Sequence, residues 1–230
     1  MNSKKSSYVI LLGAALAGPV HASNFLASET LSSGNIIYDS PSSGLSRTLN
    51  ISDFGDSISD LSVTLNIGSA PGDTAWNSDL YVQLTSPQGR VAVLLNQPGI
   101  TSSDLVGYGD AGLNLTIHDT SSHDIHNYQT FSYSLNGNGQ LTGAWQSDGR
   151  LDPTSLSRTS QLGNLAGENP NGDWVLLIAD RGNGNLAQLN GWGISGSAIT
   201  AVPEPATITC WTALALAGFG FIRRSRRSAV

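Results

Sequence analysis

Short runs of alternating apolar and polar residues are the feature that most constrains the fold of this chain. Alternation with a period of two predicts strands with one buried face at 61–67, 80–84 and 113–117. The runs 91–95 and 174–178 are more continuously apolar, as in strands at the centre of a sheet. No segment shows the period of an amphipathic helix, so these strands must bury their apolar faces against a second sheet. The sequence therefore predicts an all-β sandwich.

The segments between these runs have the composition of turns. The chain contains 14 Asp and 26 Gly but only 3 Glu and 2 Lys, and Asp and Gly favour turns where Glu and Lys favour helices. In the segment Ser86-Pro-Gln-Gly89, proline takes an early turn position. We therefore expect a hairpin that joins 80–85 to 90–95.

The N-terminus has the pattern of a secretory signal peptide over residues 1–22. Lys4 and Lys5 supply the positive start, the apolar run 8–17 follows, and Val20-His-Ala22 precedes a cleavage point before Ser23. The apolar run is shorter than the roughly 20 residues that a membrane span needs. We expect export across the inner membrane.

The C-terminus has a three-part pattern: a linker over 200–205, an apolar segment over 206–222 that we expect to form a transmembrane helix, and a basic tail over 223–230. The 17 residues of the apolar segment reach about 25 Å, slightly less than a hydrocarbon core of about 30 Å, and snorkelling Trp and Arg side chains can close that gap. The arginines place the tail in the cytoplasm and the body outside. The pattern rests on Pro203, Glu204, Pro205, Arg223, Arg224, Arg226 and Arg227.

This pattern resembles a PEP-CTERM sorting signal. The resemblance implies a Gram-negative bacterium that makes exopolysaccharide, exosortase as a partner, and cleavage near Pro203–Pro205. Until then the chain would stay in the inner membrane; afterwards the body would reach the cell envelope, cell surface or extracellular matrix. An anchor that is never cut remains the alternative.

The exported body is strongly acidic. Residues 23–202 contain five Arg, no Lys and 16 acidic residues, a net charge of −11, and Cys210 lies outside them. This composition excludes nucleic acid as a partner, because phosphate contacts need basic residues. It also excludes a disulfide scaffold and a cysteine nucleophile in the body. Residues 23–49 are Ser-rich and fit a flexible lead-in or an edge strand, and we place the sandwich at 50–199.

Several blocks of this body resemble the P domain, or P/Homo B domain, of subtilisin-like proprotein convertases. The residues are Asp79-Leu80 with Ser86-Pro87 and Gly89, the strand 172–180, and the strand 186–194, with 58–67 as the opening strand. The resemblance implies a jelly-roll β-sandwich and an association with serine endopeptidases. The chain has no Gly-x-Ser-x-Gly elbow or other catalytic serine segment, so we expect it not to be an enzyme.

Asp-rich loops suggest a calcium site. Asp79 opens one predicted strand and Asp180 closes another, so the two carboxylates share one end of the sandwich if these strands are antiparallel neighbours. Ca²⁺ binds six to eight oxygen atoms, and short carboxylates on loops supply them. We predict that Asp79 and Asp180 bind Ca²⁺ together with Asp119. Turn capping by these residues is the alternative.

Two tryptophans and three histidines suggest other sites. Trp76 and Trp145 fall in polar segments and are candidates for stacking on sugar rings, with burial as the alternative. His118, His123 and His126 are dense enough for a zinc loop, although their spacing is not a standard one. Three functions remain open: a Ca²⁺-stabilised interaction or structural module, an exopolysaccharide-binding module, and an accessory to a separate subtilisin-like protease.

Overall fold

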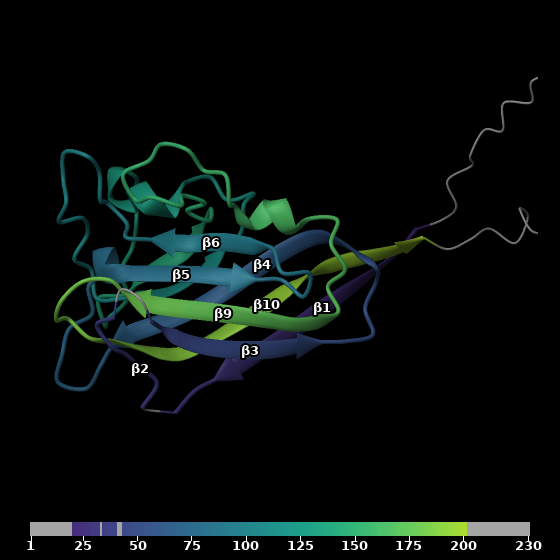
Figure 1. The fold of residues 1–230 in the computed structure, drawn as a ribbon, viewed down its shortest axis with the longest axis horizontal. Coiled ribbons are helices and arrows are strands. Elements are labelled where there is room, and N and C mark those ends of the chain that lie inside the picture. The colour runs from purple at the N-terminus through teal and green to yellow at the C-terminus, as the bar shows by residue number, and fades with distance from the viewer. Residues whose placement is uncertain (1–19, 33, 41–42, 202–230) are drawn as a thin grey trace, which may run out of the picture. The chain divides into compact units, whose positions relative to one another are not determined.

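The structure, a computed structural model, describes residues 20–32, 34–40 and 43–201 (Figure 1). Its strands are β1 (Val20–Thr30), β2 (Ile36–Ile37), β3 (Leu45–Ile51), β4 (Ser57–Ser69), β5 (Leu80–Thr85), β6 (Val91–Asn96), β7 (Leu113–Ile117), β8 (Leu141–Trp145), β9 (Gly172–Asp180) and β10 (Ala187–Ala201). Three short 3₁₀ helices, η1 (Asn77–Asp79), η2 (Ile125–Thr130) and η3 (Leu162–Leu165), lie between them. The prediction of an all-β fold is confirmed.

The strands form two sheets that pack face to face. One sheet has the order β1-β10-β4-β7-β8, with β2 also paired to β10, and the other has the order β3-β9-β5-β6. In Figure 1 the four-stranded sheet lies in front of β4 and β10. All pairs with an assigned register are antiparallel except β7 with β8, which is parallel.

The five strands predicted from their alternating or continuously apolar residues are β4, β5, β6, β7 and β9, and their inward residues form the core. Leu65 and Ile67 of β4 belong to the same buried cluster as Leu84 of β5 and Leu176 of β9. The predicted hairpin is also present, since β5 pairs antiparallel with β6 and the Gly89 amide donates to the Ser86 carbonyl over 2.9 Å. The two-residue period thus specified which side of each sheet is buried.

Residues 23–49 supply edge strands to both sheets. β1 borders the six-stranded sheet, and β3 borders the four-stranded sheet through a seven-residue ladder with β9. Phe25 of β1 is buried in the core. The sandwich therefore begins well before residue 50.

The predicted membrane segment lies outside the described residues, as do residues 1–19 of the predicted signal peptide. Within the described ranges, no helix is both apolar enough and long enough to cross a membrane.

The core predicts a measurable contrast between two leucines. Leu84 is fully buried, so Leu84→Ala should lower the free energy of unfolding by about 2–5 kcal/mol through lost burial and the cavity it leaves. Leu156 is 94% exposed, and Leu156→Ala should change it by less than about 0.5 kcal/mol. Urea unfolding followed by tryptophan fluorescence measures both, and similar effects would contradict the two-sheet core.

Candidate functional site

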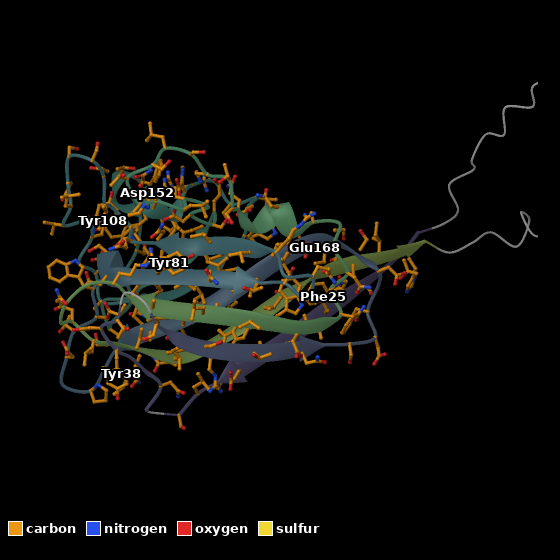
Figure 2. The ribbon with its side chains drawn as sticks, viewed as in Figure 1. Phe25, Tyr38, Tyr81, Tyr108, Asp152 and Glu168 are labelled. Carbon is orange, nitrogen blue, oxygen red and sulfur yellow. The ribbon has the colours of Figure 1, made fainter. Side chains whose placement is uncertain are left out.

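Asp79 and Asp180 lie at the same end of the sandwich. β5 and β9 are antiparallel neighbours, and their register pairs Leu80 directly with Asp180. Asp79 immediately precedes Leu80, and its carbonyl accepts a 2.7 Å hydrogen bond from the Arg181 amide. The pairing on which the proximity of the two carboxylates depended is therefore confirmed. Figure 2 shows Tyr38 and Tyr108 at this end of the molecule and Phe25 toward the other.

The Asp180 carboxylate is fully buried and only partly hydrogen-bonded. Its Oδ1 accepts a 3.1 Å hydrogen bond from the Gly182 amide, but its Oδ2 has no partner among the described residues. The neighbouring Arg181 does not neutralise it, because that guanidinium lies 3.7 Å from the ring centroid of Tyr81, which Figure 2 labels, and donates to Asn96. A buried carboxylate oxygen without a donor or a cation costs free energy.

Three neighbours complete this acidic end. Asp39 pairs with Asp180 in an isolated parallel bridge, and its Oδ2 accepts from the Gly184 amide over 2.7 Å. A side chain at Gly182 would collide with the Asp79 carboxylate, so this glycine leaves room for the acid. The side chain of Asn185 is near enough to Asp79 to lower the pKa of that carboxyl. Asp39, Asp79 and Asp180 together with Asn185 are called the acidic end below.

The environment of the two central acids favours their protonated forms. Burial raises the pKa of Asp180 to about 7, although the Gly182 amide opposes this, and the negative charges of Asp79 and Asp39 add to the rise. Burial also raises the pKa of Asp79; the side chain of Asn185 opposes it and the charge of Asp39 adds to it. Like charges close together disfavour simultaneous ionisation. A bound cation would reverse this balance.

The donor set fits a hard cation in part. Carboxylates, an amide and nearby backbone carbonyls are the oxygen ligands that Ca²⁺ uses. Among the described residues, however, no group of three or more His, Cys, Asp or Glu side chains is arranged to hold a metal ion. A Ca²⁺ ion at the acidic end would therefore need backbone carbonyls, Asn185 or water in addition to the acids.

The structure does not bring Asp119 to this end. Asp119 follows β7, whose other end, Leu113, pairs with Ile67 near the end of β4. Its Oδ1 accepts from the Ser147 amide at 3.0 Å and the Ser147 hydroxyl at 2.6 Å, and its Oδ2 accepts from the Gly163 amide. Asp119 joins two loops and both of its carboxylate oxygens accept hydrogen bonds, so the structure does not bring it together with Asp79 and Asp180.

The two candidate tryptophans do not form a stacking pair. Trp145 ends β8 and is only 5% exposed, and its Nε1 donates to the Thr142 carbonyl over 2.9 Å. Trp76 is half-buried and packs so closely on Gly109 that a Cβ there would lie 2.8 Å from its Cε2. The ring face of Trp145 is covered, so it cannot stack on a sugar.

The three histidines have separate environments. His118 Nε2 bonds to Asp60 over 2.8 Å, and the His123 ring stacks on Phe131 with centroids 3.9 Å apart. His126 is buried, and its two ring nitrogens contact Asp148 at 2.8 Å and the Ile100 carbonyl at 2.9 Å.

These contacts exclude a shared zinc site for the three imidazoles. They also occupy both nitrogens of His126. Burial lowers the pKa of His126, but the hydrogen bond to Asp148 and its charge outweigh this, and the net pKa is raised. Both ring nitrogens face acceptors, a carboxylate and a carbonyl, and this arrangement favours the protonated imidazole.

Sequence reasoning missed Asp39, Gly182 and Asn185. The last two belong to the turn Asp180-Arg-Gly-Asn-Gly-Asn185, whose alternation of Gly with Asn is a recognisable loop signal next to a predicted ligand. Asp39 carries no such signal, because its place beside Asp180 depends on a long-range bridge. The sorting residues Pro203, Glu204, Pro205, Arg223, Arg224, Arg226 and Arg227 lie outside the described residues.

The family comparison identifies the class of protein to which this two-sheet fold belongs. A family model for the proprotein convertase P-domain matches residues 58–195. The chain belongs to the proprotein convertase P-domain family. A second family model, the PEP-CTERM protein-sorting motif, matches residues 201–227. This match marks a secreted envelope or surface protein of a Gram-negative bacterium and implies processing by exosortase.

Solved structures with a similar arrangement are much longer than this chain. A crystal structure of a serine protease of Aeromonas sobria is 16% identical, with a TM-score of 0.43, over 78% of this chain and 27% of that chain. A structure of Aeromonas sobria serine protease with the chaperone ORF2 is also 16% identical, with a TM-score of 0.42 and the same coverage. This chain thus spans about a quarter of those proteins. No curated protein matches it.

The raised pKa of Asp180 predicts a pH dependence of stability. Because the folded state binds the proton more tightly, this contribution is complete below about pH 4 and is lost as the pH rises through about 7. In chelator, the wild type should therefore lose up to about 4 kcal/mol of unfolding free energy relative to Asp180→Asn between pH 4 and pH 8. Urea unfolding across that range measures the difference.

The control for this prediction is Asp173→Asn. Asp173 lies at the other end of β9, is exposed, and accepts a hydrogen bond from Asn50. If the wild type and Asp180→Asn keep the same difference at every pH, Asp180 does not carry a raised pKa in the folded protein.

Proposed function

We propose that this chain is a non-catalytic, exported surface module whose sandwich acts in the cell envelope or extracellular matrix after exosortase has removed its tail. The observation that carries the proposal is the order of two family matches, with the P-domain over 58–195 and the sorting motif directly after it. Before processing, the chain is held in the inner membrane by residues 206–222. We also propose that the sandwich is a jelly roll, and its two mainly antiparallel sheets support this.

The proposed role is binding or structure rather than chemistry. Among the described residues, the one buried histidine–aspartate pair has both imidazole nitrogens occupied, so it offers no base for a nucleophile. Among the residues that the structure describes, no hydroxyl or thiol hydrogen-bonds to a carboxylate of the acidic end; Asp180 and Asp39 accept from backbone amides. The acidic end instead presents several carboxylate oxygens whose burial and mutual repulsion a bound cation would relieve.

We further propose that Ca²⁺ stabilises the acidic end. Three observations support this proposal. The buried Oδ2 of Asp180 has no partner among the described residues, and Gly182 leaves room for the Asp79 carboxylate because it has no side chain. Residues 23–202 also carry a net charge of −11, which favours a cation. Bound Ca²⁺ would tie the loop after β9 to the turn before β5. This would fix the loops at that end of the sandwich for contact with a partner.

A second candidate function is favoured by the family itself. Membership of the proprotein convertase P-domain family supports a role as an accessory to a separately encoded subtilisin-like serine endopeptidase. The exported protein should then copurify with such a protease and raise its half-life at elevated temperature. A protease whose half-life is unchanged by the added module would exclude this role.

Export and sorting predict two defined termini. Cleavage of the leader and tail should give a mature protein that begins at Ser23 and ends near Pro203–Pro205. Intact-mass spectrometry of the protein from its own host measures both ends, in cells with and without exosortase. A mature chain that retains residues 206–230 in exosortase-positive cells would contradict the processing step.

Ca²⁺ binding predicts a shift in the melting temperature. At 100 times its dissociation constant, a ligand specific for the folded state adds about 2.7 kcal/mol, which corresponds to roughly 5–10 °C for a domain of this size. The exported protein should melt that much higher in Ca²⁺ than in chelator, whereas Asp180→Asn should show no shift. Asp173→Asn should keep the full shift, and an unchanged wild-type midpoint would exclude the site.

A further inference from the structure

The outer face of the six-stranded sheet carries a groove that the acidic end does not use. In Figure 1 this face lies at the back, behind β4 and β10. The groove has a volume of about 370 Å³ and is lined by residues from β1, β4, β7, β8 and β10. Its central side chains are Thr64 and Asn66 of β4, Asn114 and Thr116 of β7, and Asn190 of β10.

These side chains form matched cross-strand pairs. Asn66 is directly opposite Asn114, and Thr64 is directly opposite Thr116. Asn114 and Thr116 make no side-chain hydrogen bond to any residue in the described ranges, so their donors and acceptors are available to a ligand. Residues opposite each other on one face lie about 5 Å apart, so the groove presents a close ladder of amides and hydroxyls.

The amides at one end of the groove are held in place by one another. Asn66 Oδ1 accepts from Gln140 over 3.0 Å and from Asn190 over 3.4 Å. Asn190 Oδ1 in turn accepts from Gln188 Nε2 over 2.8 Å. The other amide atom of this side chain, Gln188 Oε1, is buried and has no partner among the described residues. A fixed network of amides loses less side-chain entropy on binding than mobile side chains do.

A glycine of β10 lies close to two residues that line the groove, Ser28 and Thr64. At Gly193 of β10, a Cβ would lie 2.9 Å from both the Ser28 Cβ and the Thr64 Oγ1, so any side chain there would fill the space between β1 and β4. Glycine within a strand costs about 0.5–1 kcal/mol relative to alanine. Its presence in a central strand is explained by this close approach.

Two further depressions each share one lining residue with the groove. A depression of about 310 Å³ shares Asn190 with it and is lined by Asn138 and Gln140. A second depression, of about 270 Å³, shares Gly143 and is lined by His123, Tyr133 and Trp145. The groove and these two depressions are together called the path below.

The chemistry of this path selects an uncharged ligand. The one charged residue in the central groove is Glu29, which pairs with Arg47 and accepts from Trp192. Amides and hydroxyls both donate and accept hydrogen bonds, as sugar hydroxyls do. The net charge of −11 on the exported body repels polyanions.

We propose that the path binds a neutral polysaccharide along the outer face of the six-stranded sheet. The hydroxyls of consecutive sugar units pair with the amide and hydroxyl ladder, and the aromatic edge near Gly143 borders one end of the bound chain. This site is separate from the acidic end, and it places glycan recognition on a surface that does not depend on Trp76.

The test is affinity electrophoresis of the exported protein in native gels that contain a polysaccharide. The neutral probes are hydroxyethyl cellulose, galactomannan, dextran and the uncharged fraction of the host's own extracellular polysaccharide. Alginate is the anionic probe. The protein should be retarded by at least one neutral probe and not by alginate, because binding depends on uncharged hydrogen-bonding groups.

A matched pair of double variants locates the site. Asn114→Ala with Thr116→Ala removes the free ladder groups and should weaken binding about tenfold or more. Thr48→Ala with Asn50→Ala removes the same residue types from the exposed face of β3 in the other sheet, and binding should be unchanged. Circular dichroism and melting temperature verify that both variants fold.

Three results would overturn the proposal. These are no retardation by any neutral probe, stronger retardation by alginate, and equal losses in the two folded double variants. Each is distinguishable from failure of the Ca²⁺ site, because none depends on Asp180 or on the melting shift.

Discussion

The antiparallel pairing of β5 with β9 is the interaction on which the rest of the molecule depends. It joins segments far apart in the sequence, forms the middle of the four-stranded sheet, and places Leu84 and Leu176 opposite each other in the core. The same register fixes the ends of both strands. Asp79 and Asp180 are therefore close because the apolar faces must align, and the core determines the geometry of the acidic end.

The strands that could be predicted from the sequence have apolar residues at their inward positions, apart from Asp180 at the end of β9. β4, β5 and β9 alternate or are continuously apolar, so local sequence suffices. β3 also alternates, but a charged residue, Arg47, occupies one of its inward positions. In β1, Glu29 likewise occupies an inward position. These two form an ion pair between the edges of the two sheets. An inward charge satisfied by a distant partner hides a strand from single-sequence reasoning, and the same limit concealed the bridge from Asp39 to Asp180.

The two proposed sites use opposite electrostatics on one small domain. At the acidic end, burial and mutual repulsion raise the pKa values of Asp79 and Asp180, so the unliganded fold is less stable at neutral pH than it would be with a neutral side chain there. The outer groove carries amides and hydroxyls and keeps its one acid, Glu29, paired. A cation and an uncharged chain would therefore not compete for the same surface.

Several departures from simple strand rules lie beside that groove. β10 contains Gly191, Gly193 and Gly196, and its register with β4 shifts between Leu189 and Gly191. Glycines in a long central strand lower its intrinsic stability, and a bulge re-aims the side chains beside it. The shift lies next to Asn190, the residue shared by two of the three depressions. Features that lower local stability, such as strand glycines and a bulge, are expected where a surface is shaped for binding. Here these features lie next to the amide network of the groove.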